Sequence, residues 1–70
     1  MYVQEIIFLV EEASEGGYEA KAVGYSIYSE ADTMKELREV VKDAVRTHFD
    51  EKDMPKLIRL HLVKDEVIAV

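Results

Sequence analysis

The stretch Asp32-Thr-Met-Lys-Glu-Leu-Arg-Glu-Val-Val-Lys-Asp-Ala-Val-Arg-Thr-His-Phe49 decides the fold of this chain. Thr33 followed three residues later by Glu36 is a capping box, in which each side chain bonds the free backbone N–H of the other residue. Apolar positions then recur at steps of three and four residues, which predicts one amphipathic helix over residues 32–49. The stripe consists of Met34, Leu37, Val41, Ala44, Val45 and His48.

Extended, β-rich sequence lies on both sides of this helix. Residues 2–12, 18–23 and 25–30 are predicted as strands before it, and residues 57–63 as a strand after it. Residues 67–70 form either a short fifth strand or the end of one long strand that is broken by a bulge. The centre of the first strand, Ile6–Val10, is apolar at both parities, so we expect an inner strand that is covered on both faces.

The order of elements predicts an α+β fold of the type β-β-β-α-β, with a possible fifth strand. The first three strands form an antiparallel meander, and the helix is a crossover that allows the fourth strand to lie parallel to the first. The expected spatial order of the strands is 3-2-1-4, with the helix on one face. A single helix covers only one face of a sheet, so the other face needs a partner.

Size and charge limit what the domain can be. The chain has 70 residues, no cysteine, and nine Lys and Arg against fifteen Asp and Glu, for a net charge of −6. This length suits one domain over residues 1–70, and oligomerisation is the common remaining way to stabilise so small a core without disulfides. The acidic balance argues against direct nucleic-acid binding and favours a basic partner, or serves solubility alone.

The sequence contains no segment that resembles a membrane span or a secretory signal. The longest apolar run is Ile6–Val10, whereas a spanning helix needs roughly 20 apolar residues. No basic region precedes an apolar run near the N-terminus. We therefore expect a cytoplasmic protein without a membrane partner.

The residue types that carry chemistry form no pattern typical of catalysis. His48 is either a metal ligand or general base, or a packed histidine that suits the negative end of the helix. His61 has no second ligand at metal-binding spacing, which favours a solvent-facing or interface histidine. We expect no catalytic residue, no metal and no cofactor. The alternative is a small metal-dependent nuclease or hydrolase that uses these histidines or the carboxylates Glu11, Glu12, Glu15, Glu30, Asp32, Asp50, Glu51, Asp53, Asp65 and Glu66.

Aromatic and apolar side chains on the strands are the candidates for an interaction surface. Tyrosine is enriched at protein interfaces, although it is also a common strand residue. The apolar run over residues 67–70 would invite pairing with another chain if it forms an edge strand. The predicted interaction residues are Ile7, Leu9, Tyr18, Tyr25, Tyr28, Ile68 and Val70.

Several of these motifs together resemble the HicB-like antitoxin domain. Gly16-Gly17-Tyr18 closes the first hairpin, Gly24 separates two strands, and Ala31-Asp32-Thr33 with Glu36-Leu37 opens the helix. The resemblance covers residues 5–62 and implies a fold similar to part of ribonuclease H without its catalytic acids. It implies a protein-binding role, in which family members neutralise a small basic mRNA-cleaving toxin, HicA. No DNA-binding domain follows within the chain, so we expect a homo-oligomeric interaction module without operator binding.

Overall fold

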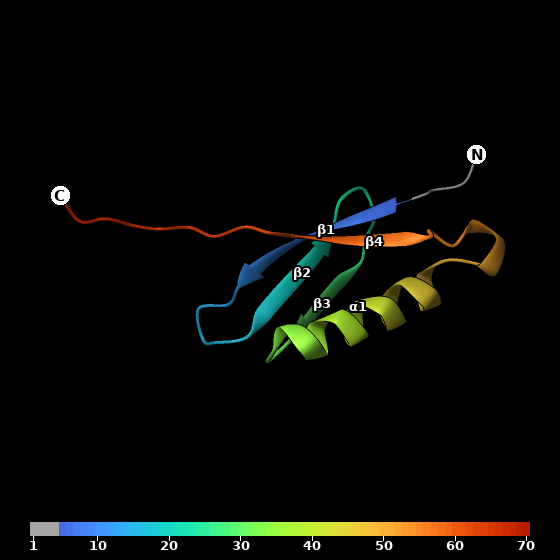
Figure 1. The fold of residues 1–70 in the computed structure, drawn as a ribbon, viewed down its shortest axis with the longest axis horizontal. Coiled ribbons are helices and arrows are strands. Elements are labelled where there is room, and N and C mark those ends of the chain that lie inside the picture. Colours follow the sequence, from blue (N-terminus) through green and yellow to red (C-terminus); the bar gives the residue numbers. More distant parts are fainter. Residues whose placement is uncertain (1–4) are drawn as a thin grey trace.

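A computed structural model describes residues 5–70 and shows one mixed sheet with one α-helix packed against it (Figure 1). The sheet has the order β3-β2-β1-β4, with β1 and β4 parallel and the other two pairs antiparallel. This confirms the predicted α+β fold, its topology and its strand order. The elements are β1 (Glu5–Glu12), β2 (Tyr18–Ala22), β3 (Tyr28–Ala31), α1 (Met34–His48), a short 3-10 turn (Glu51–Asp53) and β4 (Leu57–Leu62).

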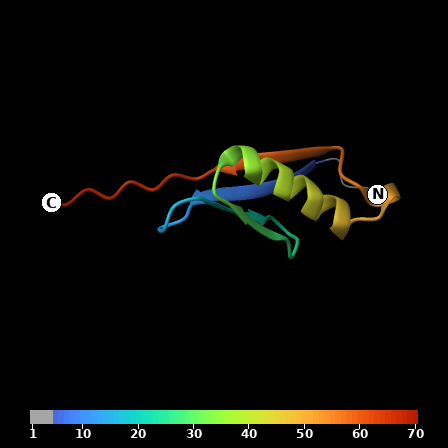
Figure 2. The same ribbon diagram turned by 90° about the horizontal axis from the view of Figure 1, so that it is seen from below.

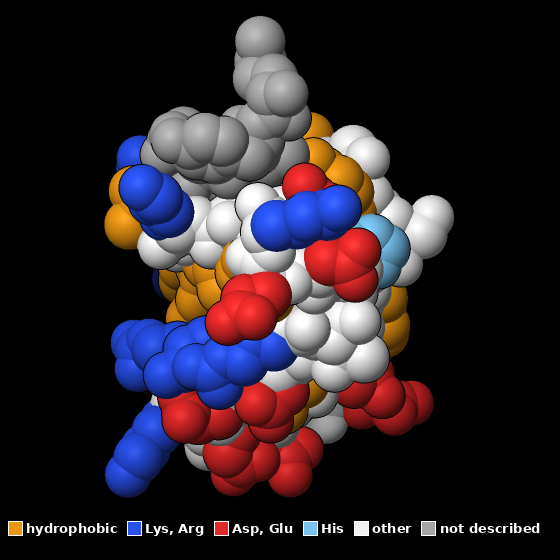
Figure 3. All heavy atoms as spheres, turned by 90° about the vertical axis from the view of Figure 1, so that its right-hand side faces the viewer, with side chains coloured by type: hydrophobic (Ala, Val, Ile, Leu, Met, Phe, Trp, Pro, Cys, Tyr) orange, Lys and Arg blue, Asp and Glu red, His pale blue; other side chains and the backbone are white. Residues whose placement is uncertain are grey.

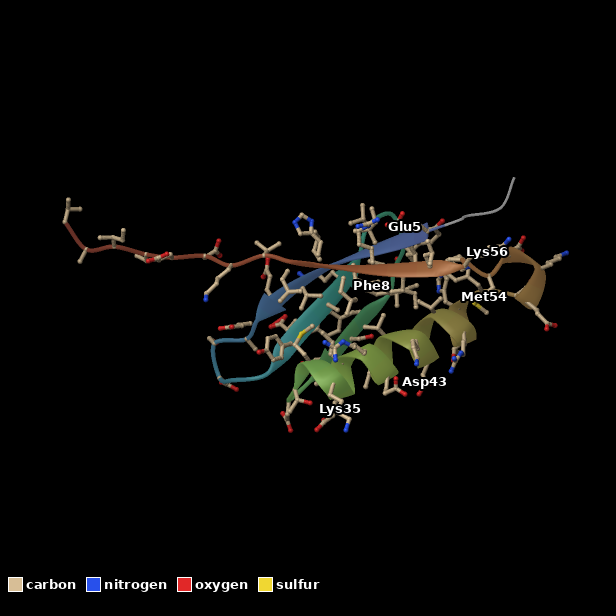
Figure 4. The ribbon with its side chains drawn as sticks, viewed as in Figure 1. Glu5, Phe8, Lys35, Asp43, Met54 and Lys56 are labelled. Atoms are coloured by element: carbon tan, nitrogen blue, oxygen red, sulfur yellow. The ribbon has the colours of Figure 1, made fainter. Side chains whose placement is uncertain are left out.

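The core lies between α1 and one face of the sheet. Register places Phe8 opposite Ala22 on β2 and opposite Leu60 on β4, so these side chains share the face that α1 covers. Phe8 lies in the space between sheet and helix, whereas Lys35 and Asp43 point away from the sheet (Figure 4). The buried apolar residues are Ile6, Phe8, Val10, Ala20, Ile27, Leu37, Val41 and Val45.

The helix begins and ends where its sequence signals place the boundaries. The backbone N–H of Glu36 donates to Oγ1 of Thr33 at 3.1 Å, which satisfies one free N–H of the first turn. Among the described residues only this half of the predicted capping box forms. At the other end the N–H of Phe49 donates to the carbonyl of Val45 at 3.1 Å. The apolar stripe, rather than the exposed charges, therefore holds the helix on the sheet.

The prediction that β1 is covered on both faces is wrong within this chain. Its even-numbered side chains are buried, but Ile7 and Leu9 remain 37% and 40% exposed on the opposite face. Figure 2 views the molecule from the helix side, and Figure 1 shows no element on the other side of the sheet among the described residues. The inner position of β1 is nevertheless confirmed, since β1 pairs with both β2 and β4.

Strand boundaries differ from the predictions around Gly24. β2 ends at Ala22, and β3 begins at Tyr28 rather than at residue 25. Gly24 has φ +84, a left-handed conformation that breaks the extended path, and the N–H of Ala22 donates to the carbonyl of Ile27 across the resulting turn. Tyr25 thus lies in a connection instead of a strand. For the first strand, the predicted residues 2–4 lie outside the described part of the chain.

Neither the possible fifth strand nor its alternative, one long strand broken by a bulge, forms: β4 ends at Leu62, and residues 63–70 run extended beyond it without entering the sheet. The segment 64–66 is Lys-Asp-Glu and has neither the glycine nor the proline that is typical of a turn, and the chain does not reverse there. The last backbone hydrogen bond to β1 comes from Val63, directly after β4, whose N–H donates to the carbonyl of Val10. Beyond that point β1 turns into the hairpin, and the segment has no neighbour within the described chain.

Gly17 is the glycine whose replacement should be costly. It has φ +82, and an added Cβ would lie 2.8 Å from the carbonyl oxygen of Ala31. Gly16 has φ +99 but open space around the same position. We expect Gly16→Ala to lower the free energy of unfolding by about 1–2 kcal/mol through backbone strain alone. Gly17→Ala should cost clearly more in urea denaturation, and equal losses would contradict a role for the Ala31 contact.

Ser29 is a residue whose replacement should increase stability, because it places a hydroxyl in the core. Its side chain is buried opposite Ala20, and among residues 5–70 its Oγ has no hydrogen-bond partner. A buried hydroxyl without a partner keeps its desolvation cost. We expect Ser29→Ala to raise the free energy of unfolding by about 1 kcal/mol, whereas Ser26→Ala at an exposed site should leave it nearly unchanged. A loss of stability in Ser29→Ala would show that the hydroxyl is satisfied in solution.

Candidate interaction surface

The side chains opposite α1 form the candidate functional site, which we call the open face. Strand register defines it, because Leu9 lies beside Lys21 on one neighbour and His61 on the other. Val23 joins this face beside β1, since its N–H donates to the carbonyl of Ile7 at 2.8 Å. The open face comprises Glu5, Ile7, Leu9, Glu11, Glu19, Lys21, Val23, Tyr28, Glu30, Leu57, Arg59, His61 and Val63.

One half of the open face is apolar and exposed. Ile7 and Leu9 lie at its centre on β1, between Val23 on one side and Leu57 towards the start of β4. Val23 is 52% exposed and Leu57 is 62% exposed. Lys21, Arg59 and His61 lie among these apolar side chains, and exposed apolar residues gathered on one face of a small domain are typical of a protein interface. This patch of Ile7, Leu9, Val23 and Leu57 is therefore the part of the face best suited to bury area against another protein.

The other half of the open face is polar and acidic. The Tyr28 hydroxyl lies 3.1 Å from Oε2 of Glu19 and 3.3 Å from Oε2 of Glu30, and its one proton is shared between these acceptors. The pKa of Tyr28 is raised to about 12. The largest cause is desolvation, followed by the hydrogen bond and the charge of Glu19 and then by Glu30. The phenol therefore remains a neutral donor at physiological pH and holds the two carboxylates together.

An ion pair bridges β1 and β4 between Ile7 and Leu57. The Arg59 guanidinium donates to Oε1 of Glu5 on the neighbouring strand. This hydrogen bond, followed by the charge of Glu5, raises the pKa of Arg59 further above its ordinary value. The pair is solvent-accessible, so it orients the two side chains more than it stabilises the fold.

The structure brings together some of the predicted interaction residues and separates others. Ile7, Leu9 and Tyr28 share the open face. Tyr18 lies on the helix side, since it is paired with Ala31 and packs against the core. Tyr25 packs edge-to-face against Phe49 with ring centroids 5.1 Å apart. Ile68 and Val70 lie on the exposed segment beyond β4.

Val23 and Leu57 were not predicted as interaction residues, although the sequence carried a signal for both. Each lies at the end of its alternating strand pattern, on the side that also carries charged residues. The apolar character of the patch emerges only when β2 and β4 are placed on either side of Ile7 and Leu9.

The histidines lie on different faces of the molecule. The His48 ring lies at the end of α1, 4.9 Å from the Phe49 ring and 6.0 Å from the Tyr25 ring. His61 lies on the open face beside Leu9. Within residues 5–70, no three His, Cys, Asp or Glu residues are arranged to hold a metal ion. No helix in that range has the length and apolar character needed to cross a membrane.

Charge at the end of the molecule near the 50–56 loop is mixed. Lys and Arg side chains and Asp and Glu side chains both gather in this view, and neither sign covers the surface (Figure 3). On α1, Lys42 pairs with Glu39 at 3.0 Å and Arg46 pairs with Asp43 at 3.6 Å. These exposed pairs neutralise the neighbouring like charges of the helix and contribute little to stability.

The architecture defines a class: small α+β domains whose one-sided sheet leaves an apolar patch uncovered. By sequence, the chain is 48% identical over 67 residues to a UPF0150 protein of Thermotoga maritima, covering 96% of this chain and 94% of that protein. It is 51% identical over 55 residues to a UPF0150 protein of Archaeoglobus fulgidus, covering 79% of this chain and 82% of that protein. The chain belongs to the UPF0150 family. No family model matches it, and no solved structure matches it significantly.

The raised pKa of Tyr28 can be checked by ultraviolet titration of phenolate absorbance. An ordinary tyrosine ionises near pH 10, whereas Tyr28 should ionise near pH 12. Because the folded state holds this proton more tightly, its contribution to stability is complete below pH 10 and is lost as the pH rises to about 12. Glu19→Gln should lower the pKa of Tyr28, and Glu15→Gln in the hairpin turn should not change it. Loss of the late transition in both variants would contradict the assignment.

Proposed function

We propose that this chain is a non-catalytic, HicB-like protein-interaction module that self-associates and offers its open face to a protein partner. The observation that carries the proposal is the exposed apolar patch of Ile7, Leu9, Val23 and Leu57 on the uncovered side of the sheet. Fully burying an exposed aliphatic side chain is worth about 1.5–3 kcal/mol, and these residues, which are 37% to 62% exposed, can each gain the corresponding fraction. A patch of four such residues is a strong thermodynamic reason to bind another protein.

The charge around the patch supports a basic partner. Glu11, Glu19 and Glu30 form one row across β1, β2 and β3 on the open face, and the chain carries a net charge of −6. Lys21 and His61 lie directly beside Leu9, and Arg59 lies beside Ile7, so the acidic row is on one side of the patch only. Acidic groups at the rim of an interface accelerate association with a positively charged protein and disfavour an acidic one. A small basic protein of the HicA type, as the resemblance implies, fits the acidic side of this face.

The placement of the polar groups supports a binding role over a catalytic one. Hydrolytic chemistry needs a base, an acid or a metal at one point. His48 is engaged with Tyr25 and Phe49 at the end of α1, and His61 lies on the opposite face of the sheet. No observation among residues 5–70 favours the alternative of a small metal-dependent nuclease or hydrolase.

Self-association is tested by light scattering on the purified chain at micromolar concentration. We expect a defined oligomer, because the exposed apolar surface is large for so small a domain. The measurement should be repeated across a dilution series with circular dichroism to follow folding. A folded monomer at every concentration would remove self-association from the proposal.

Partner binding is tested by co-expression with a small basic protein of the HicA type, followed by affinity purification. The wild-type chain should retain the basic protein, and Leu9→Glu should lose most of it because a carboxylate replaces the centre of the patch. Val40→Glu is a matched control, since Val40 is 39% exposed against 40% for Leu9 but lies on α1. Failure of the folded wild-type chain to bind, or equal loss in both variants, would argue against the open face as the binding site.

A further inference from the structure

Among residues 5–70, β4 and the segment that follows it carry the most exposed large apolar side chains. Leu62 is 57% exposed at the end of β4, and Val67 and Ile68 are 95% and 80% exposed further along. Residues 63–70 run straight away from the sheet (Figure 1). The opposite edge, β3, has only 4 residues and ends beside α1. An apolar, extended edge without cover is a template for pairing with another strand.

The backbone of β4 is oriented for such pairing. The N–H of Val63 donates to the carbonyl of Val10 at 2.8 Å, so odd-numbered residues of β4 direct their polar backbone groups to β1. Because these groups alternate along an extended chain, Leu60 and Leu62 direct theirs to the free edge. No strand within residues 5–70 pairs with that edge.

We propose that residues 60–70 of two copies pair antiparallel about a two-fold axis at Asp65, joining both sheets along β4. This inference rests on the proposed self-association and assigns it a surface. The sequence Leu-His-Leu-Val-Lys-Asp-Glu-Val-Ile-Ala-Val is self-complementary about Asp65. The expected pairs with the partner copy are Leu60 with Val70, His61 with Ala69, Leu62 with Ile68, Val63 with Val67, and Lys64 with Glu66.

Charge selects this register over its neighbours. In the proposed register, Lys64 of each copy lies opposite Glu66 of the other, which gives two attractive pairs beside the axis. Moving the axis to residue 64 places Lys64 opposite Lys64, and moving it to residue 66 places Glu66 opposite Glu66. Placing the axis between two residues would set outward-directed backbone groups against inward-directed ones. Only the Asp65 pair on the axis is repulsive.

The proposed register also brings apolar side chains together at the free edge. Leu62 is 57% exposed and shares the helix side of the sheet with Val10, its register partner on β1. Directly opposed residues of an antiparallel pair project to the same face. The partner's Ile68, opposite Leu62, therefore projects to the helix side and covers the exposed part of Leu62.

The proposed pairing leaves the open face free. A two-fold axis between antiparallel strands is perpendicular to the sheet, so both α1 helices lie on one side and both open faces on the other. The four-stranded sheet of each copy continues into that of its partner. The dimer thus presents two apolar patches on one surface, which suits a protein partner that is itself paired.

A disulfide test uses the absence of cysteine from the chain. Opposed residues of a non-hydrogen-bonded antiparallel pair have Cα atoms about 4.5 Å apart, within the range that a disulfide spans. Asp65→Cys should therefore cross-link two copies under mild oxidation, reversibly with reductant and with an unchanged circular dichroism spectrum. Asp53→Cys, in the exposed 3-10 turn, is the matched control. Equal cross-linking of the two variants would overturn the proposed axis.

A charge-exchange test examines the register, using sedimentation equilibrium at low salt. Lys64→Glu and Glu66→Lys each replace both attractive pairs by repulsive ones, and each should weaken the dimer about tenfold or more. A mixture of the two variants restores opposite charges at both sites and should form a heterodimer close to wild-type affinity. If the wild-type chain dimerises and the two variants dimerise with the same affinity, the proposed β4 register is wrong, while self-association stands. If the folded wild-type chain remains monomeric, both proposals fall.

Discussion

Packing of β1 is the interaction on which the rest of the structure depends. Its even-numbered side chains, among them Phe8, are buried beneath α1, while Ile7 and Leu9 lie on the other side without cover. A strand that is apolar on both faces normally occurs in a sheet with a layer on each side. Here a single helix supplies one layer, so the central strand that organises the core also creates the exposed patch. The buried core and the exposed patch thus originate in the same strand.

The two surfaces that we propose for association differ in their chemistry. The open face combines an apolar patch with carboxylates and the Tyr28 hydroxyl, which suits a partner with apolar and basic groups. The free edge of β4 offers unpaired backbone groups and a self-complementary sequence, which suits a second copy. Because edge pairing extends the sheet sideways, it does not compete with binding to the face. In the proposed assembly the two surfaces act together: edge pairing sets the geometry, and the paired faces bind the partner.

Several residues show why sequence patterns predict only part of the structure. The helix and the strand order were predictable because a capping signal at Thr33 and alternating apolar positions are local features. Tyr25 was placed on a strand by its β propensity, but it instead packs against Phe49 at the end of α1, a contact between distant parts of the chain. Tyr18 was grouped with the interaction residues, yet register places it on the helix side. Residues 67–70 read as a strand by composition and remain unpaired, because β1 turns away before it can reach them.

Sequence alone determined the types and order of the elements, the acidic charge and the presence of more apolar strand surface than one helix can cover. These follow from local periodicity and from counting, which need no knowledge of neighbours. Tertiary structure decided which side chains share a face: it brought Val23 and Leu57 beside Ile7 and Leu9 and sent Tyr18 and Tyr25 to the other side. The reason is that strand register and crossover direction depend on contacts between segments far apart in the chain, and a shift of one residue exchanges the two faces.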